Sequence, residues 1–582
     1  MNKFSNVLAV RALNHWRNYN IPTYLGLRFL LRQVPKSQSS DFLTKFIMDK
    51  FPLRQMGRYR RFLRFKSISP EGAIKYRHMF AASPSTSLAE AYVLHILSCL
   101  NTFKNKPYIY SNLWHKNNNT GRYFRYFYSS YSERNYKITQ IAKGDPDYYI
   151  VSTDIKSFYP SINQQVAMDI FNTKISDMKN REHKNLISDT YKQLLDCTDQ
   201  GIPIGPALSD ILANVVLERV DKEMYSLIEN RYFRYVDDII MVLKKNEISS
   251  IKNRLEKLII QQGLELNPEK DDVISSRKWI DNIYNKEEKF ASRQFNQLLD
   301  RIHLYLWNDP SDKGKLDENL KYNGIAMPIS RYKVDVTYGR YHRYMKYLVN
   351  YKKTYRMILN NIKYESYKTM NDDIQYLEKV FNDLVLKINI QSENNSNLIN
   401  KLKMQRLRYF LNRLIYLTPY NDYYKLINVA PDTTEFYEYK ILLESLLNSS
   451  IDQLVKLPGP VISTFSSVYR ELSLGEIDIK YDKINNEENF DSIATLTAFG
   501  LVKPSQDWVS KLNKNDQEYI KFCAFTPFKS RILTDFSYED ELRTLQINES
   551  LDEKLQKTLI DTRFNDLECI NFDALLLSDY DY

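Results

Sequence analysis

Residues 232–243 read YFRYVDDIIMVL, an apolar run that two adjacent acids interrupt. On both sides of Asp237 and Asp238 the composition is that of a buried strand. Burying a carboxylate costs several kcal/mol unless the charge is paired or binds a metal ion. We therefore predict a β-hairpin that carries both carboxylates at its tip, where they point at cations.

A third acid stands at the end of a second predicted strand. Residues 147–153 are rich in strand-forming residues and run directly into Asp154. A carboxylate at the end of one strand can meet a carboxylate hairpin on an antiparallel neighbour. Three carboxylates supply the hard oxygen ligands that Mg²⁺ prefers, and two such ions stabilise the attacking and leaving oxygens of a phosphoryl transfer. The joint pattern indicates an active site rather than a surface turn.

Four segments resemble the signature motifs of reverse transcriptases. Residues 154–162 (DIKSFYPSI) resemble motif A, residues 201–213 (GIPIGPALSDILA) motif B, residues 235–238 (YVDD) motif C and residues 263–270 (GLELNPEK) motif D. They follow one another in the order and at the spacing of that family, over roughly residues 70–275. The resemblance implies an α+β fingers-palm fold with an antiparallel palm sheet. It also implies a nucleotidyltransferase, either an RNA-directed or a template-independent DNA polymerase.

The resemblance assigns the metal ligands and a substrate preference. Asp154 and Asp237 should hold two Mg²⁺ ions, for which Mn²⁺ can substitute, with Asp238 nearby and less direct. Tyr159 matches the steric-gate aromatic under the nucleotide sugar, so deoxynucleotides are the expected substrates. The alternative for Tyr159 is a core aromatic beside a strand.

Further residues match the family's nucleotide site. A glycine at 205 would leave room for the incoming base pair, and a lysine at 270 would lie near the triphosphate. Basic residues ahead of Pro84 stand where the family grips the triphosphate. The predicted nucleotide-binding set is Lys75, Arg77, Ile155, Phe158, Tyr159, Gly205 and Lys270. The alternatives are a surface salt bridge for Arg77 and an exposed lysine for Lys270.

Motif B carries Ile204 where retron and group II intron enzymes usually carry Gln. In this respect, and in Phe158-Tyr159, the sequence is more similar to bacterial abortive-infection and defence-associated reverse transcriptases. That group implies antiphage defence in the bacterial cytoplasm, a homo-oligomer and, in some members, untemplated and protein-primed synthesis. One alternative is a templated enzyme that uses a dedicated non-coding RNA. Another is a nucleic-acid-binding scaffold with a vestigial palm.

The chain has 582 residues, too many for one hydrophobic core. We divide it into an N-terminal helical region with the fingers (1–145), the palm with motifs A to D (146–285), a thumb-like basic helical region (286–400) and a C-terminal helical domain with an acidic tail (401–582). The region after the palm reads as all-α, with a degenerate α-repeat left open. No apolar run is long enough to span a membrane, so no membrane partner is expected.

The formal net charge of +11 favours a polyanionic partner, DNA, RNA or both, beside the dNTP substrates. Residues 122–128 and 338–356 interleave cations with aromatic rings, as single-strand channels do. The alternative for each stretch is a tyrosine-rich core helix. The predicted nucleic-acid-binding set is Arg122, Arg125, Arg340, Arg343 and Lys346.

Three local predictions concern the residues ahead of the palm. The 54/58/61 and 60/64 spacings of the arginines between Lys50 and Lys66 predict that the basic residues 1–70 are helical. Residues 88–97 read as a capped amphipathic helix. Residues 106–143 read as irregular.

Overall fold

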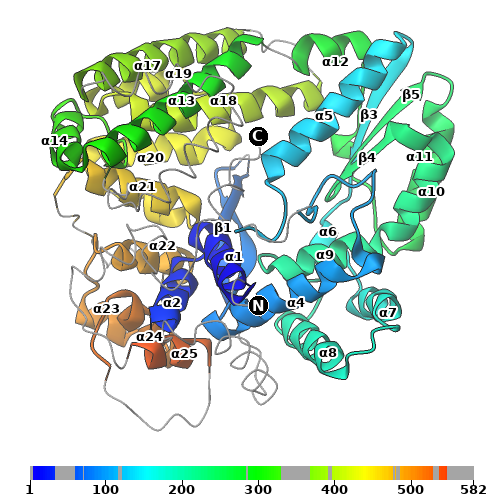
Figure 1. Ribbon diagram of the computed structural model, residues 1–582, viewed down its shortest axis with the longest axis horizontal. Coiled ribbons are helices and arrows are strands. Elements are labelled where there is room, and N and C mark those ends of the chain that lie inside the picture. Colours follow the sequence, from blue (N-terminus) through cyan, green and yellow to red (C-terminus); the bar gives the residue numbers. More distant parts are fainter. Residues whose placement is uncertain are drawn as a thin grey trace.

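Figure 1 shows the computed structural model. It describes residues 4–32, 59–329, 367–479 and 486–546, apart from 70, 116–120, 284–285, 391–395, 476, 478 and 529–536. Within the described residues, all strands lie ahead of residue 276 and the elements beyond are helices. The predicted fold, an α+β fingers-palm half followed by an all-α half, is confirmed.

The palm is a four-stranded antiparallel sheet in the order β4-β5-β3-β6. Its strands are β3 (Tyr148–Asp154), β4 (Tyr232–Tyr235), β5 (Asp238–Lys244) and β6 (Asp272–Ser275). Both predicted strand segments are present, and residues 232–243 form the β4–β5 hairpin with Asp237 in its turn. The register places Asp154 directly opposite Asp238.

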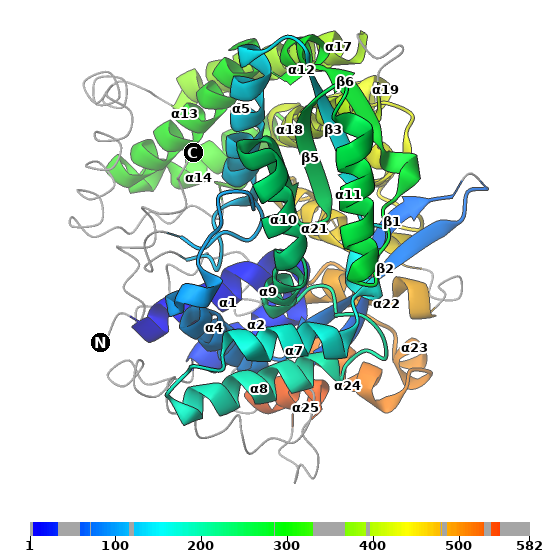
Figure 2. The ribbon, with the colours of Figure 1, turned by 90° about the vertical axis from the view of Figure 1, so that its right-hand side faces the viewer.

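Helices cover both faces of this sheet because its side chains alternate between two apolar clusters. Ile150 and Val242 face one cluster, which α5 and α12 complete. Val151 and Met241 face the main core on the side of α10 and α11, the side seen in Figure 2. The covering helices are α5 (Phe127–Gly144), α10 (Glu218–Ile228), α11 (Ile248–Gln261) and α12 (Ser276–Ile283).

The fingers carry a separate two-stranded hairpin, β1 (Tyr59–Ile68) and β2 (Ile74–Ala82). The predicted helix is therefore wrong for Arg60, Arg61 and Arg64, whereas Arg54 and Arg58 lie outside the described residues. The spacing of the cations fits a helix as well as a strand. The apolar residues between them favour the strand, because they pack against β2. Arg60, Phe62 and Arg64 lie on one face of the strand. On that face Phe62 is directly opposite the buried Met79 of β2.

Helix α4 follows β2 and forms the centre of the fingers. Ser83 caps it by accepting the Thr86 N–H, and the helix begins at Pro84. The predicted helix over 88–97 is confirmed, but it is buried on nearly every face rather than amphipathic, because four helices pack around it. The helices of this region are α1 (Phe4–Tyr19), α2 (Ile21–Arg32), α4 (Pro84–Cys99), α6 (Phe158–Ser161), α7 (Gln164–Lys174), α8 (Arg181–Leu195) and α9 (Ala207–Val216).

Helix α5 replaces much of the irregular structure predicted for residues 106–143. It spans 18 residues, starts without a side-chain cap and has few apolar positions, so its own sequence signal is weak. Tertiary packing stabilises it instead. Ile138 and Ala142 join the palm cluster, and the Trp279 indole N–H of α12 donates to Thr139 Oγ1 at 3.0 Å.

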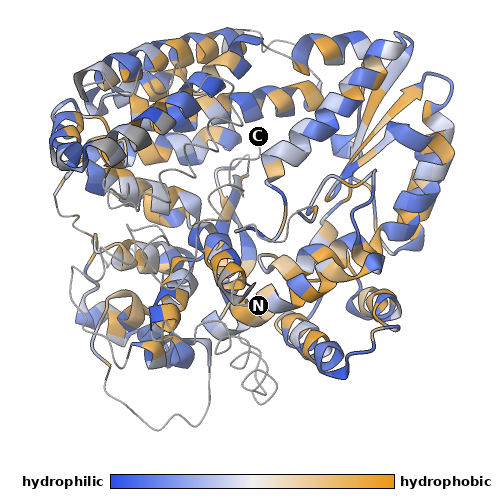
Figure 3. Ribbon diagram, in the orientation of Figure 1, coloured by the Kyte–Doolittle hydropathy of each residue, from blue (hydrophilic) through white to orange (hydrophobic). Residues whose placement is uncertain are grey.

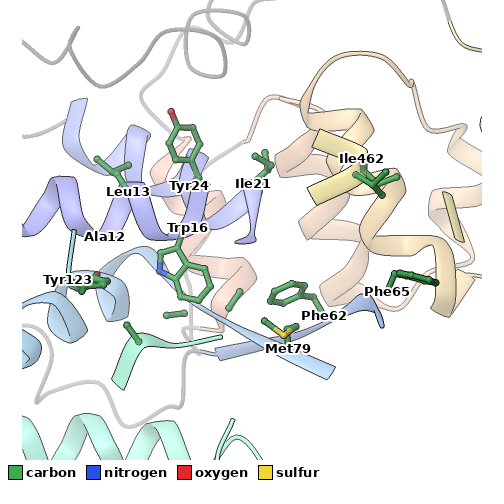
Figure 4. Packing of buried hydrophobic residues seen from close by; sticks show 14 of the residues in the cluster. Ala12, Leu13, Trp16, Ile21, Tyr24, Phe62, Phe65, Met79, Tyr123 and Ile462 are labelled. Carbon is green, nitrogen blue, oxygen red and sulfur yellow. The ribbon is translucent and has the colours of Figure 1, made fainter. Parts of the chain in front are cut away.

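The fingers and the C-terminal helices share one core, in which Trp16 of α1 lies beside Phe62 and Met79 of the hairpin, with Ile462 of α21 nearby (Figure 4). The Phe65 N–H of β1 also donates to the Pro458 carbonyl at 2.8 Å. The C-terminal helices are α13 (Lys286–Asn308), α14 (Lys313–Tyr322), α17 (Tyr367–Ile390), α18 (Asn397–Leu417), α19 (Tyr423–Val429), α20 (Tyr437–Asn448), α21 (Pro460–Glu471), α22 (Asn486–Ala498), α23 (Gln506–Ser510), α24 (Lys514–Cys523) and α25 (Tyr538–Leu545).

Two further observations bear on the predicted organisation. The boundary predicted between residues 400 and 401 falls inside α18, so it separates no structural units there. Apolar residues line the palm strands and the inward faces of the helices, while the outer faces are polar (Figure 3). Among the described residues, no helix is both long and apolar enough to cross a membrane.

A buried acid in α4 gives a prediction about stability. Glu90 is 0% exposed and accepts a hydrogen bond from the Tyr59 hydroxyl at 2.6 Å. Burial raises the pKa of Glu90 from 4.5 to about 8. Between these values the folded protein holds a proton that the unfolded chain has lost, so the free energy of unfolding falls as pH rises from about 5 to about 8. Glu90→Gln should flatten this fall in thermal unfolding.

Asp507→Asn serves as the matched control, because the Asp507 side chain is 79% exposed. It should leave the dependence of melting temperature on pH unchanged. A Glu90→Gln profile that coincides with that of the unmodified protein would show that the buried carboxyl does not titrate as stated.

Candidate active site

The β4–β5 turn holds Val236 in the left-handed region, with a φ of +57° that a β-branched residue rarely adopts. Two hydrogen bonds hold it there. The Arg234 Nη1 donates to the Val236 carbonyl at 2.9 Å, and the Val236 N–H donates to Ser111 Oγ at 3.0 Å. The turn therefore presents Asp237 and Asp238 from a fixed backbone.

Arg234 is in turn held by a buried ion pair. Its Nε and Nη2 donate to the two carboxylate oxygens of Asp221 on α10 at 2.8 and 2.7 Å, and both side chains are 0% exposed. Its Nη1 also reaches Asn214 Oδ1 of α9 at 3.1 Å. A bidentate pair with its remaining donors satisfied is rigid. The sequence analysis missed Arg234, although a basic residue inside a buried strand is a signal of this kind.

Asp154 lies at the end of β3, beside the hairpin. The next residue's N–H, that of Ile155, donates to the Asp237 carbonyl at 3.2 Å, and the Asn267 N–H of motif D donates to the Asp154 carbonyl at 2.8 Å. The Lys270 ammonium donates to Asp154 Oδ2 at 2.7 Å. The structure thus brings motifs A, C and D together, and it places Lys270 on the carboxylate of Asp154.

The carboxylates interact strongly with one another. Burial first, and then the charges of Asp154 and Asp238, raise the pKa of Asp237 from 3.8 to about 6. Burial also raises the pKa of Asp154, while Lys270 acts in the opposite direction. Like charges held this close favour a bound cation.

Lys401 of α18 supplies a cation that sequence reasoning missed. Its ammonium donates to both carboxylate oxygens of Asp238, at 2.6 and 2.7 Å. Two further bonds fix the start of α18 on the palm. The Leu398 N–H donates to the Asp272 carboxylate at 2.8 Å, and the Asn397 side chain donates to the Glu269 carbonyl at 3.3 Å.

The predicted magnesium ligands fit a divalent cation in charge and in donor type. In the part of the chain that the structure describes, no three acid, His or Cys side chains are already gathered into a metal site. Lys270 and Lys401 instead hold oxygens of two of the three acids. A metal ion at Asp154, Asp237 and Asp238 would therefore compete with these two ammonium groups.

The predicted steric gate lies beside the carboxylates and has a partner. The Tyr159 hydroxyl donates to Asp210 of α9, and burial raises the pKa of Asp210 from 3.8 to about 6. Motif B approaches the backbone of Tyr159 through Gly201, where a Cβ would lie 2.6 Å from the Tyr159 carbonyl. The Ile202 N–H donates to that same carbonyl at 2.9 Å. Motif B and Asp210 together fix the gate.

Gly205 is required for a reason other than the predicted one. Its φ is +124°, and a Cβ there would lie 2.6 Å from the Phe80 carbonyl of β2. Its own carbonyl contacts the His15 ring of α1 at 2.9 Å. The glycine therefore lets motif B meet the fingers, and its predicted contact with a base pair stays a prediction.

The fingers hairpin places two arginines side by side. Arg64 and Arg77 are directly opposite in the β1–β2 register and share one face, and Lys75 lies on that face nearer the hairpin tip. Like charges opposite each other destabilise a hairpin unless an anion binds. Burial and the charge of Asp210 raise the pKa of the Tyr19 hydroxyl, and the two guanidinium groups lower it. Both arginines therefore lie near Asp210, the hydrogen-bond partner of Tyr159. Arg64 was missed because its strand was predicted as helix.

Two predicted nucleotide contacts need correction. Ile155 and Phe158 are 1% and 3% exposed and belong to the main core. A side chain so covered cannot touch a nucleotide, so these residues support motif A from beneath.

The predicted nucleic-acid contacts are described only in part. Arg122 stacks on the Tyr126 ring at 4.7 Å, and Arg125 pairs with Glu133 of α5 at 2.9 Å. The other three residues, Arg340, Arg343 and Lys346, lie outside the described residues.

The fold and these side chains together define the class of protein. An antiparallel palm sheet with three carboxylates at one end, beside Tyr159 and a basic hairpin, is the arrangement that a nucleotidyltransferase requires. Residues 94–298 match the model of the family described as reverse transcriptase (RNA-dependent DNA polymerase). The chain therefore contains a reverse transcriptase domain, and it is an enzyme of nucleotidyl transfer.

Solved structures give weaker likenesses. Apo telomerase from Candida tropicalis is 12% identical, with 62% of this chain and 72% of that chain covered and a TM-score of 0.27. Telomerase from Candida albicans in complex with a fragment of telomeric RNA is 10% identical, with 75% and 68% covered and a TM-score of 0.26. No curated protein matches the chain.

The Lys401–Asp238 pair gives a prediction about metal binding. Lys401→Met should tighten Mn²⁺ binding about tenfold, because a hydrogen-bonded ammonium no longer competes for Asp238. Binding can be measured from the electron paramagnetic resonance signal of free Mn²⁺. Lys425→Met is the control, since Lys425 is 58% exposed and pairs with Asp422 in the same helical region. Unchanged or weaker binding in Lys401→Met would contradict the competition.

Proposed function

We propose that this protein is a Mg²⁺-dependent DNA polymerase that acts in bacterial antiphage defence. The observation that carries the polymerase assignment is the meeting of Asp154, Asp237 and Asp238 at one end of the palm sheet. A surface or scaffold role gives no reason to place three carboxylates at the end of one sheet in a basic protein, because they would repel bound nucleic acid.

The side chains around the carboxylates suit a deoxynucleoside triphosphate. Arg64 and Arg77 would hold the triphosphate through paired guanidinium contacts. The ring of Tyr159, fixed by Asp210, would stand against the 2′ position of the sugar. Divalent ions at the carboxylates would activate the 3′-hydroxyl of the growing strand and neutralise charge on the leaving pyrophosphate.

The defence assignment is supported by motif B and by the C-terminal half. Ile204 is apolar and packs against the main core, so motif B offers no amide side chain at this position. The helices after the palm pack against the fingers, as an integral part of the enzyme would. We propose on the same basis that the protein acts as a cytoplasmic homo-oligomer and that its synthesis is untemplated, primed by a protein hydroxyl.

A templated enzyme is the second candidate, because the matching family is described as RNA-dependent. The two candidates differ in what the purified protein needs. Untemplated, protein-primed synthesis requires only Mg²⁺ and dNTPs, and its product shifts on a gel after protease treatment. Templated synthesis requires added RNA, and its product is insensitive to protease.

The double substitution Asp237→Ala with Asp238→Ala tests the active site. It should reduce dNTP incorporation to background and abolish protection against phage, because the metal ligands are removed. Incorporation can be followed with labelled dNTPs on a denaturing gel. Asp507→Ala, on an exposed acid, should retain full activity. Synthesis that persists in the double variant would contradict the assignment of these carboxylates to the active site.

Tyr159→Ala tests the gate. Removing the ring should raise the incorporation of ribonucleotides relative to deoxynucleotides by about tenfold or more, since the steric clash with the 2′-hydroxyl is lost. The ratio of kcat/KM for matched nucleotide pairs measures the effect. Tyr159→Phe keeps the ring and should keep the selectivity above that of Tyr159→Ala. An unchanged ratio in Tyr159→Ala would mean that another group reads the sugar.

A further inference from the structure

The first turns of α5 expose aromatic rings that the core does not account for. Phe127 and Tyr128 are 61% and 47% exposed. Tyr131 lies one turn after Tyr128 on the same side of the helix. Helix α18 reaches the same face of the palm, where Leu398 and Leu402 join the cluster that α5 completes.

One group of contacts adjoins the catalytic hairpin. The rings of Tyr131 and Tyr235 have centroids 5.5 Å apart, and the Arg134 guanidinium lies 4.2 Å from the Tyr131 ring and 5.7 Å from that of Tyr235. Arg134 is 1% exposed, yet its nearest acceptor is the neutral Asn135 amide oxygen at 3.3 Å. Among the described residues its Nη1 has no hydrogen-bond partner.

A second group of contacts lies between the two helices. Tyr128 of α5 stacks on Tyr409 of α18, with centroids 6.3 Å apart and planes at 25°. The Arg413 guanidinium lies 3.4 Å from the Tyr409 ring centroid. Its Nη1 donates to the Tyr409 carbonyl at 3.0 Å, and its Nε has no partner within the described part of the chain.

Neither group includes an acid side chain, although the charges of Asp210 and Glu288 reach Tyr235 and Tyr128. No ion pair of Arg134 or Arg413 is present among the described residues, although burying a cation without a counter-charge is costly. Rings that stack bases and cations that follow phosphates are the requirements of single-strand binding. An anionic polymer that bears flat rings suits the exposed Tyr128 ring and the half-buried Arg413 guanidinium beside Tyr409, whereas a free phosphate leaves the tyrosines unused.

We propose that Tyr128, Tyr131, Tyr409 and Arg413 form a strand-binding surface for single-stranded DNA, with the buried Arg134 guanidinium holding the Tyr131 ring from within the protein. Its first group touches Tyr235 of the catalytic hairpin, so the strand it holds is the product as it leaves the active site. This inference rests on the proposed function, because a DNA polymerase supplies that strand. It adds a binding site from α5 and α18 that lies outside the three carboxylates.

Fluorescence anisotropy with a labelled oligo(dT) strand tests the surface. The double variant Tyr128→Ala with Tyr409→Ala should bind the strand about tenfold more weakly, the loss expected for removing stacked rings. Tyr424→Ala is the matched control, since Tyr424 is 51% exposed and has the Lys425 ammonium 5.7 Å from its ring. It should bind as the unmodified protein does. Thermal unfolding verifies that the variants are folded.

The salt dependence separates a phosphate contact from a merely structural arginine. Arg413→Met should reduce the slope of log K against log salt by about 0.7, the value for one phosphate contact on a single strand. Equal affinity and equal slope in all variants would overturn the proposal. So would a loss confined to duplex DNA, or a preference of the unmodified protein for oligo(U), which would assign the surface to a template RNA.

The binding experiments use the Asp237→Ala background without dNTPs, so they do not depend on synthesis. Loss of strand binding in the tyrosine variants supports the surface even if the purified protein incorporates no nucleotide. Normal synthesis by the tyrosine variants, with unchanged strand affinity, overturns the surface and leaves the polymerase assignment intact.

Discussion

The buried pair of Arg234 and Asp221 is the interaction on which the site depends. It joins the hairpin to α10, and through Asn214 to α9. The helices beneath the palm therefore hold the hairpin and its carboxylates in place. The same guanidinium holds the carbonyl of Val236 in a backbone conformation that the residue does not favour on its own. Removing one member would leave the other charge buried and unpaired, at a cost of about 3–5 kcal/mol.

The second constraint is that the C-terminal half contacts both the fingers and the palm. The Pro458 carbonyl pairs with the backbone of β1, and the Arg60 guanidinium of the same strand pairs with Asp516 and Glu539. On the palm, Lys401 reaches Asp238. The helices after the palm therefore contact the candidate active site, and a boundary drawn at residue 400 cuts through one of them.

Those parts of the fold and the site could be predicted from the sequence in which a residue type has only one plausible structural role. Adjacent acids in an apolar run required a hairpin tip, and Asp154 at a strand end required a partner, so the palm and its carboxylates could be predicted. Arg64 could not, because cations spaced along a polar stretch fit a strand or a helix equally well. Lys401 gives no local signal at all, since a lysine in an amphipathic helix is usually solvated, and its role arises only from the packing of α18 on the palm.

Helix α18 links the predicted metal-binding carboxylates to the proposed strand-binding surface. It carries Lys401 at the carboxylates and Arg413 about 18 Å further along, by the rise of an α-helix. If a bound strand shifts α18 as one body, the ammonium group on Asp238 moves with it. Linkage then requires the reverse effect of equal size. If strand binding draws Lys401 away from Asp238, metal binding must strengthen the hold on the strand, and the enzyme would bind its product most tightly when its carboxylates are loaded.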